Sequence, residues 1–145
     1  MIASRENTSS TRIFVDTAAY FAAFNGNDSR HRQAVATFGR LLEARSKLFT
    51  TNFVVAETHA SLVRKVGRAT ARRVVFDLHR GDTTIVRASE LDERYALDIL
   101  ERYDDKDFSL TDTLSFAVMV RLGIDVAFTF DRHFAQFGLR LIGPE

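Results

Sequence analysis

Short apolar runs alternate along this chain with longer segments in which apolar residues recur every three or four positions. Runs of the first kind predict strands, and a period of three to four predicts helices. The predicted strands are residues 12–15, 47–51, 83–87 and 125–129, with a short last strand at 139–142. The predicted helices are residues 17–24, 28–44, 52–66, 70–80, 89–103 and 110–122. Strands alternating with helices indicate βαβ units, so we expect an α/β fold whose central sheet is mainly parallel, with helices on both faces.

Several element ends carry their own signals. Asn52 stands where it can cap the helix 52–66, and Gly67 follows that helix. Ser89 with Asp92 three residues later predicts a capping box at the start of the next helix. In the helix 28–44, one apolar stripe is expected to face the core, formed by Ala34, Val35, Phe38, Leu41 and Leu42.

Length and composition narrow the class of protein. With 145 residues, of which 46% are hydrophobic, the chain suits one domain, which we place at residues 12–145 after a polar tail at 1–11. The absence of cysteine excludes disulfides and Cys-ligated zinc or iron–sulfur sites. Apolar stretches are broken well short of a membrane span, and the N-terminus lacks the apolar core of a signal peptide. We therefore expect a cytoplasmic protein that does not enter a membrane.

Four acidic residues fall where a parallel sheet binds ligands, at the carboxyl ends of its strands. Asp16 directly follows the first strand, and Asp131 follows the strand 125–129 after one Phe. Asp112 lies in the first turn of the helix 110–122. Glu57 lies in the helix after the second strand, close to the apolar stripe of that helix, where a lone charge is costly to bury.

Each acid also has an ordinary structural explanation. Asp16 can cap a helix, Asp112 suits the positive end of a helix dipole, and Asp131 can open a turn. Glu57 can pair with a neighbouring Arg. Together, however, four acids at one sheet edge repel one another unless a cation neutralises them, which favours a metal site.

Carboxylates without cysteine suit a hard cation such as Mg²⁺ or Mn²⁺. Such sites activate a water for in-line attack on a phosphodiester. A dinucleotide enzyme is excluded because no Gly-rich turn follows a strand. An aspartyl-phosphate phosphatase would normally carry a second acid two residues after Asp16, where this chain has Ala18. The acids therefore point to metal-dependent phosphodiester chemistry.

Four segments resemble the successive motifs of the PIN-domain nucleases, and most of all the VapC-like toxin ribonucleases of bacterial toxin–antitoxin pairs. They are RIFVDTAAY, NFVVAETHASLV, DKDFSLTDTLSFAVM and FTFDRHFAQFGLRL, and the resemblance covers nearly the whole chain from Arg12 to Ile142. The resemblance implies a Rossmann-like sheet and Mg²⁺- or Mn²⁺-dependent cleavage of RNA. It assigns catalysis and metal binding to Asp16, Glu57, Asp112 and Asp131, with Asp107 as a further candidate ligand.

The resemblance also implies partners and supporting residues. Family toxins are held inactive by a cognate antitoxin, often as toxin dimers, so an antitoxin and a homodimer are expected. Thr17 matches a small hydroxyl residue usual after the first acid, and Thr111 can support a ligating carboxylate or a water. Asn52 can do the same or simply cap its helix. A PIN-like module that has lost catalysis and only binds RNA or protein is the alternative function.

Basic residues and histidines complete the set of candidates. The densest basic cluster, a candidate RNA-binding surface, consists of Arg64, Lys65, Arg68, Arg72 and Arg73. A solvated helical hairpin explains the same cluster without RNA. His133 can touch a substrate phosphate or cap a turn, whereas His59, two residues after Glu57 on a helix, is expected to point away from the site. The overall charge of +1 gives no general attraction to nucleic acid.

Overall fold

Five parallel strands form one sheet in this computed structural model, which describes residues 11–143. The strands are β1 (Arg12–Val15), β2 (Lys47–Thr51), β3 (Thr84–Val86), β4 (Val126–Phe128) and β5 (Arg140–Ile142). Their order is β3-β2-β1-β4-β5, and all four described pairings are parallel. The predicted tail 1–11 lies, apart from Thr11, outside the described residues. The predicted parallel α/β sheet is confirmed.

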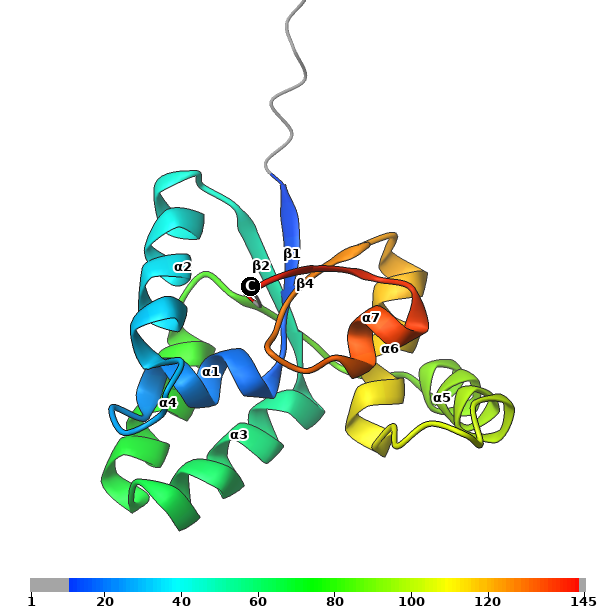
Figure 1. The fold of residues 1–145 in the computed structure, drawn as a ribbon, viewed down its shortest axis with the longest axis horizontal. Helices are drawn as coiled ribbons and strands as arrows, with labels where there is room; N and C mark the ends of the chain where they lie inside the picture. Colours follow the sequence, from blue (N-terminus) through cyan, green and yellow to red (C-terminus); the bar gives the residue numbers. More distant parts are fainter. Residues whose placement is uncertain (1–10, 144–145) are drawn as a thin grey trace, which may run out of the picture.

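Helices cover both sides of this sheet, as expected (Figure 1). They are α1 (Thr17–Phe24), α2 (His31–Glu43), α3 (Asn52–Lys65), α4 (Arg68–Arg80), α5 (Glu90–Arg102), α6 (Leu110–Leu122) and α7 (His133–Phe137). Figure 1 shows α1 to α4 on one side of the strands and α5 to α7 on the other. Among residues 11–143, none of the helices combines the length and the apolar character that crossing a membrane requires.

The core is built on aromatic side chains from the centre of the sheet and from α6 and α7. Phe14, Phe116, Phe128 and Phe134 are fully buried. The ring of Phe134 lies 4.9 Å from that of Phe116 and 6.3 Å from that of Phe14, centroid to centroid. In α6, every residue from Asp112 to Met119 is buried. This helix therefore carries its polar residues, Asp112 included, into the interior of the domain.

Two helices begin with a capping box, and only one of these boxes was predicted. Ser89 and Asp92 form the expected capping box of α5. Ser109 and Asp112 form a second box at α6, with the Ser109 hydroxyl accepting from the Asp112 amide and an Asp112 oxygen accepting from the Ser109 amide. The second box fixes the backbone that carries a candidate metal ligand.

Some predicted boundaries were wrong, for local reasons. α2 begins at His31 and not near residue 28, because Asp28 forms a turn in which its carboxylate accepts from the Arg30 amide at 2.8 Å. Thr51 and not Asn52 caps α3, by accepting from the Val54 amide at 3.1 Å. The short helix α7 was not predicted. The five residues of this helix are too few for a helical period to show.

The apolar stripe of α2 is displaced from the predicted one. Ala34 and Thr37 are buried, with Phe38 and Leu41 packed against the core. These positions follow the i, i+3, i+4, i+7 spacing of one helical face. Val35 and Leu42, which the prediction placed on that face, are 49% and 68% exposed.

Candidate metal centre and active site

The four predicted acids lie around one hollow at the carboxyl ends of β1 and β4. This acid hollow has a volume of about 250 Å³. Its walls are formed by Asp16, Thr17, Ala18, Phe21, Glu57, Ser61, Arg64, Lys65, Asp112 and Asp131. The fold therefore joins four acids that are up to 115 residues apart in sequence, as the parallel topology predicts. Their roles in catalysis and metal binding stay predictions.

Asp16 is buried, with 3% of its surface exposed, and its side chain makes no capping hydrogen bond to α1. Instead, one carboxylate oxygen accepts from the Thr129 hydroxyl at 2.8 Å. Burial raises the pKa of Asp16 to about 7, against the effect of the Thr129 hydrogen bond, and the nearby charges of Asp112 and Asp131 raise it further. Simple helix capping therefore does not explain this residue.

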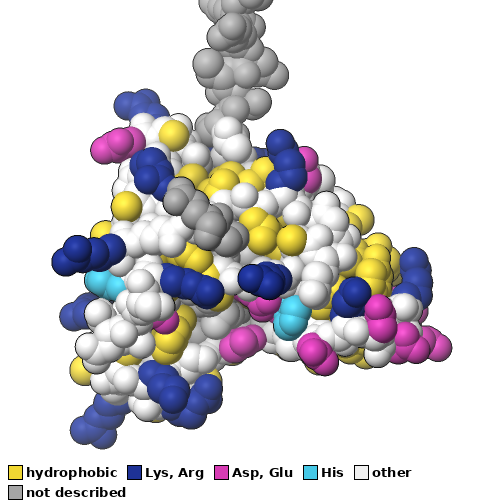
Figure 2. Space-filling model, viewed as in Figure 1, with side chains coloured by type: hydrophobic (Ala, Val, Ile, Leu, Met, Phe, Trp, Pro, Cys, Tyr) yellow, Lys and Arg dark blue, Asp and Glu magenta, His cyan; other side chains and the backbone are white. Residues whose placement is uncertain are grey.

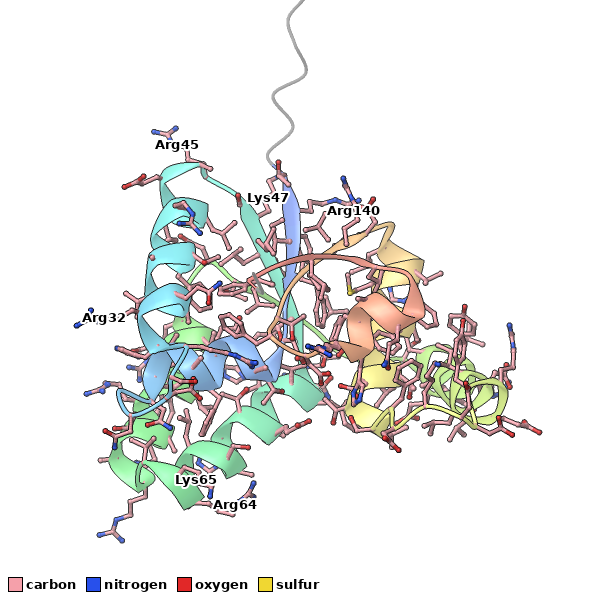
Figure 3. The ribbon with its side chains drawn as sticks, viewed as in Figure 1. Arg32, Arg45, Lys47, Arg64, Lys65 and Arg140 are labelled. Atoms are coloured by element: carbon pink, nitrogen blue, oxygen red, sulfur yellow. The ribbon has the colours of Figure 1, made fainter. Side chains whose placement is uncertain are left out.

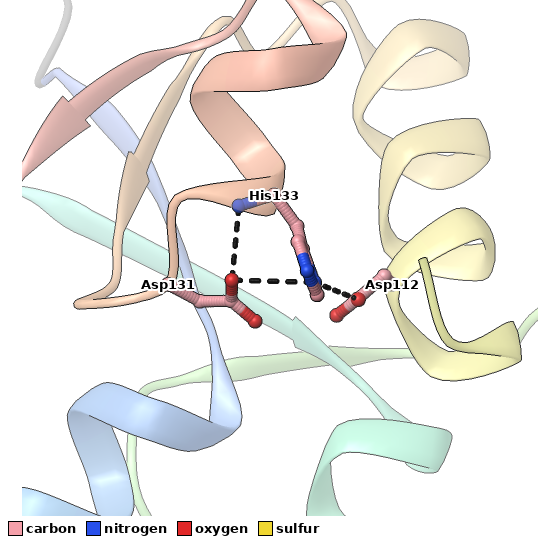
Figure 4. Close-up of side chains that lie close together, drawn as sticks. All are labelled: Asp112, Asp131 and His133. Atoms are coloured by element: carbon pink, nitrogen blue, oxygen red, sulfur yellow. Dashed lines mark hydrogen bonds and ion pairs between the residues drawn. The ribbon is translucent and has the colours of Figure 1, made fainter. Parts of the chain in front are cut away.

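Asp112 and Asp131 meet at His133 (Figure 4). The Nδ1 of His133 lies 2.8 Å from Asp112 Oδ2 and 3.3 Å from Asp131 Oδ1. One possible ligand atom from each of these three residues lies within 4.8 Å of the others. Burial raises the pKa of Asp112, whereas hydrogen bonds from Ser109 and His133 oppose the rise. Both structural explanations hold in part, because Asp112 belongs to a capping box and Asp131 accepts from the His133 amide at 2.9 Å.

Glu57 lines the hollow, but the reason for which the sequence singled it out was wrong. The buried face of α3 carries Val54, Val55, Thr58 and Leu62, and Glu57 is exposed. A second face of the same helix carries Glu57, Ser61, Arg64 and Lys65, which recur at helical spacing and line the acid hollow. Glu57 therefore lines the solvent-exposed part of the hollow, next to Arg64 and Lys65 on the same helix face.

Thr129 is a residue of the site that the sequence analysis missed. It is completely buried at the end of β4. Its hydroxyl donates to Asp16 Oδ2 at 2.8 Å and accepts from the Asp131 amide at 3.0 Å. One hydroxyl therefore sets the positions of two acids from two strands. The available signal was a Thr at the carboxyl end of a strand, two residues before Asp131.

Thr17, a predicted supporting residue, differs from Thr129 in that its hydroxyl is unpaired within residues 11–143. Its Oγ1 is buried and has no hydrogen-bond partner among the described residues, although Thr17 lines the acid hollow. A buried hydroxyl without a partner is costly, so a ligand or a water at this place would relieve it. This observation supports the predicted role of Thr17.

The structure does not bring the other predicted supporting residues into the hollow. Asn52 accepts from the Ala88 amide at 3.1 Å and lines a separate hollow with His59. Asn52 thus ties α3 to the segment after β3 instead of supporting the acids. Asp107 is exposed and Thr111 half-buried, and neither belongs to the residues that line the acid hollow.

Only part of the predicted basic cluster faces the acids. Arg64 and Lys65 line the acid hollow and project from the far end of α3 (Figure 3). Arg68, Arg72 and Arg73 are exposed on α4 and do not line it, and the Arg72 guanidinium lies 6.0 Å from the Phe76 ring. In the face shown in Figure 2, acidic side chains near the centre are bordered by Lys and Arg side chains.

The donor set fits a hard divalent cation. Carboxylate oxygens are the ligands that such cations prefer, and Asp16, Asp112 and Asp131 offer them within one hollow. Burial raises the pKa values of Asp16 and Asp112, and no cationic side chain is among the groups that lower the pKa of Asp16. A divalent cation would compensate the charge of these carboxylates.

Known proteins share this architecture. Residues 13–139 match the family model of the PIN domain. The chain is 35% identical over 138 residues to the 23S rRNA-specific endonuclease VapC20 of Mycobacterium tuberculosis, covering 92% of this chain and 99% of that protein. The crystal structure of VapC20, a protein described as a Sarcin-Ricin loop cleaving toxin, superposes with a TM-score of 0.82 and 30% identity over 91% of this chain and 99% of that one.

A more distant structure has the same fold. VapBC2 from Rickettsia felis, solved bound to a DNA fragment from its promoter, matches 91% of this chain and 98% of its own chain with a TM-score of 0.64 at 13% identity. The family model spans most of the domain and the VapC20 match spans nearly the whole chain. The chain is therefore a member of the PIN-domain family, and within that family it belongs with the VapC-type endonucleases.

Proposed function

We propose that this protein is an endoribonuclease that hydrolyses RNA phosphodiester bonds with Mg²⁺ or Mn²⁺ held by Asp16, Asp112 and Asp131, and with Glu57 as the fourth acid. The observation that carries the proposal is the burial of Asp16 beside two further acids, which raises its pKa to about 7. Sites of this kind pair buried charge with a metal. We also propose that residues 12–145 act as a single PIN domain in the cytoplasm.

Each side chain of the proposed site has its own role in RNA hydrolysis. The metal, when bound, supplies a water of lowered pKa and neutralises charge that develops on the phosphate. The Thr129 hydroxyl fixes the Asp16 carboxylate relative to the Asp131 backbone by hydrogen bonds to both. His133 donates from Nδ1 to Asp112. Glu57 lies on the α3 wall of the hollow, where its exposed carboxylate can orient a water. Arg64 and Lys65 on the same wall offer cations to the RNA backbone.

Ribosomal RNA is the first substrate to test, and an antitoxin is the partner to expect. Support comes from VapC20, which acts on 23S rRNA and matches this chain over 92% of its length. We propose that this chain likewise cuts 23S rRNA, and that it is the toxin of a toxin–antitoxin pair. Solved structures of the same fold, among them a toxin–antitoxin complex from Klebsiella pneumoniae, support an antitoxin partner. A homodimer is proposed from the family alone.

The deciding experiment is a cleavage assay on purified 23S rRNA, with products mapped by primer extension. We expect cleavage with Mn²⁺ or Mg²⁺, none in EDTA, and recovery when Mn²⁺ is restored in excess. Asp16→Asn should lower the rate at least about 100-fold, because loss of a direct metal ligand should cost at least as much as loss of a residue that only orients one. Asp98→Asn, which changes an exposed acid on α5, is the matched control and should cleave normally. A folded protein that binds RNA but never cleaves it would instead favour a binding module.

A further inference from the structure

A second hollow adjoins the acids on the side away from α3. This basic hollow, of about 620 Å³, is lined by Ala18, Arg30, Phe130, Asp131, Arg132, His133 and Gln136. It shares Ala18 and Asp131 with the acid hollow, so one wall separates the two. Asp131 is the one acidic residue of this lining, which also carries the guanidinium groups of Arg30 and Arg132 and the imidazole of His133.

Contacts of both its side chain and its backbone fix Arg30 beside this hollow. Its guanidinium lies 5.2 Å from the centre of the Phe130 ring, and its Nη1 lies 3.5 Å from the Phe130 carbonyl oxygen. Its backbone amide donates to Asp28 at 2.8 Å, and the next residue, His31, bonds through its ring to the Ala22 carbonyl at 2.9 Å. An arginine stacked on an aromatic ring loses little further freedom when it binds an anion.

The cations around the two hollows are available for an external anion. Within residues 11–143, neither Arg30 and Arg132 on one side nor Arg64 and Lys65 on the other form an ion pair with a carboxylate. These two pairs of cations flank the acids from opposite walls, α3 on one side and the start of α2 and α7 on the other. A chain of phosphates that crosses the acids would meet cations on both sides.

We propose that the RNA strand runs across the acids from α3 to α2, and that Arg30, stacked on Phe130, binds the phosphate of a nucleotide beside the scissile bond. This inference rests on the proposed ribonuclease function and adds a strand path and a phosphate site to it. A guanidinium suits that task because its planar donors match two phosphate oxygens. Protein partners with acidic segments carry similar charge, and the experiment below separates them from RNA.

Arg32, in the first turn of α2, provides a matched control for Arg30. It lies two residues after Arg30 and points away from the molecule in Figure 3. The first measurement is the affinity of purified variants for a fluorescein-labelled single-stranded RNA in EDTA, where no cleavage occurs, over a range of salt. We expect Arg30→Ala to bind about tenfold more weakly and to reduce the slope of log K against log salt by about 0.7, the value for one phosphate contact on a single strand.

Arg32→Ala should change neither quantity, because its side chain does not face the hollows. Arg30→Lys should keep the salt slope but lose part of the affinity, since lysine lacks the planar fork and the stacking on Phe130. The denaturant midpoint of each variant shows whether it is folded. Equal affinity and equal slope for Arg30→Ala and Arg32→Ala would overturn the proposal. So would an Arg30→Ala variant that binds RNA normally but binds a co-purified protein partner less well.

The strand path is tested with truncated substrates. For an RNA cut at one mapped position, shortening it on one side of the cut should abolish the effect of Arg30→Ala on KM, and shortening it on the other side should abolish the effect of Arg64→Ala. Loss of both effects from the same truncation would contradict a strand that crosses the acids. The outcomes also separate the two proposals. Arg30-dependent binding without any cleavage removes the catalytic proposal, and cleavage that ignores Arg30 removes the phosphate site.

Discussion

In metal-free buffer at about pH 8, the Asp16→Asn variant is expected to be more stable than the wild-type protein. The pKa of Asp16 is about 7 in the folded state and 3.8 without the fold, because burial disfavours the charged carboxylate. This difference corresponds to a cost of about 4 kcal/mol once both states are ionised. Asparagine removes the charge, and its side-chain oxygen can still accept from Thr129. We expect the free energy of unfolding to rise by about 2–4 kcal/mol.

The sign of the pH dependence follows from the same values. Between about pH 4 and pH 7 the folded state holds a proton on Asp16 that the unfolded chain has released. The contribution of Asp16 to stability therefore falls as the pH rises through this window and levels off above about pH 7. Urea unfolding in EDTA at a series of pH values, for wild type and Asp16→Asn, measures this contribution to the free energy of unfolding. The gain from Asp16→Asn should be largest above pH 7 and vanish near pH 4.

The exposed acid Asp98 is the control, and Asp98→Asn should change stability by less than about 0.5 kcal/mol at any pH. If Asp16→Asn destabilises the metal-free protein at about pH 8, the carboxylate is stabilised by partners in the fold. Burial without compensation would then be the wrong description of Asp16.

Thr129→Val is expected to lower both activity and stability, because it replaces one buried hydroxyl by a methyl group of similar shape. The hydroxyl donates to Asp16 and accepts from the Asp131 amide, and valine can do neither. Residues that orient metal ligands typically contribute a factor of about 10–100 in metal affinity or activity. Removing both hydrogen bonds should also cost about 1–3 kcal/mol.

Thr129→Ser separates the hydroxyl from the methyl group. It keeps both hydrogen bonds and should retain most of the cleavage rate, although it loses some packing in the core. The measurements are the rate of RNA cleavage as a function of Mn²⁺ concentration and the urea midpoint of each variant. Valine should shift the Mn²⁺ dependence to higher concentration and serine should not. Equal loss in both variants would mean that Thr129 matters through packing alone.

The sequence predicted most of the fold because the elements of the sheet carry local signals. β1 and β2 are short apolar runs bounded by polar residues, and their limits were predicted correctly. The side chains that settle the ends of helices were harder to assign, as Thr51 and Asn52 show. Both are polar residues at the end of β2, and only the position of the Ala88 amide decides that Asn52 turns away from the cap.

The sequence predicted that the four acids lie together, and it indicated Thr17 beside them, but it gave no indication of Thr129. Parallel topology brings Asp16 and Asp131 to the same sheet edge, so their meeting follows from strand order alone. Thr129 could not be assigned in this way, because its role depends on which direction its hydroxyl takes between two strands. Glu57 was predicted to lie at the site because it seemed close to the buried face of its helix. It lies at the site, but on the neighbouring exposed face of α3, which lines the hollow.

The most direct test of the account is the affinity for Mn²⁺, measured by titration calorimetry or by the paramagnetic signal of free Mn²⁺ at about pH 7.5. The proposed metal centre holds the ion among Asp16, Asp112 and Asp131. Wild-type protein and Asp98→Asn should then bind Mn²⁺ alike, while Asp16→Asn should bind at least about tenfold more weakly. Equal Mn²⁺ binding by wild type and Asp16→Asn, with RNA cleavage intact, would contradict the central claim that these carboxylates form the metal centre.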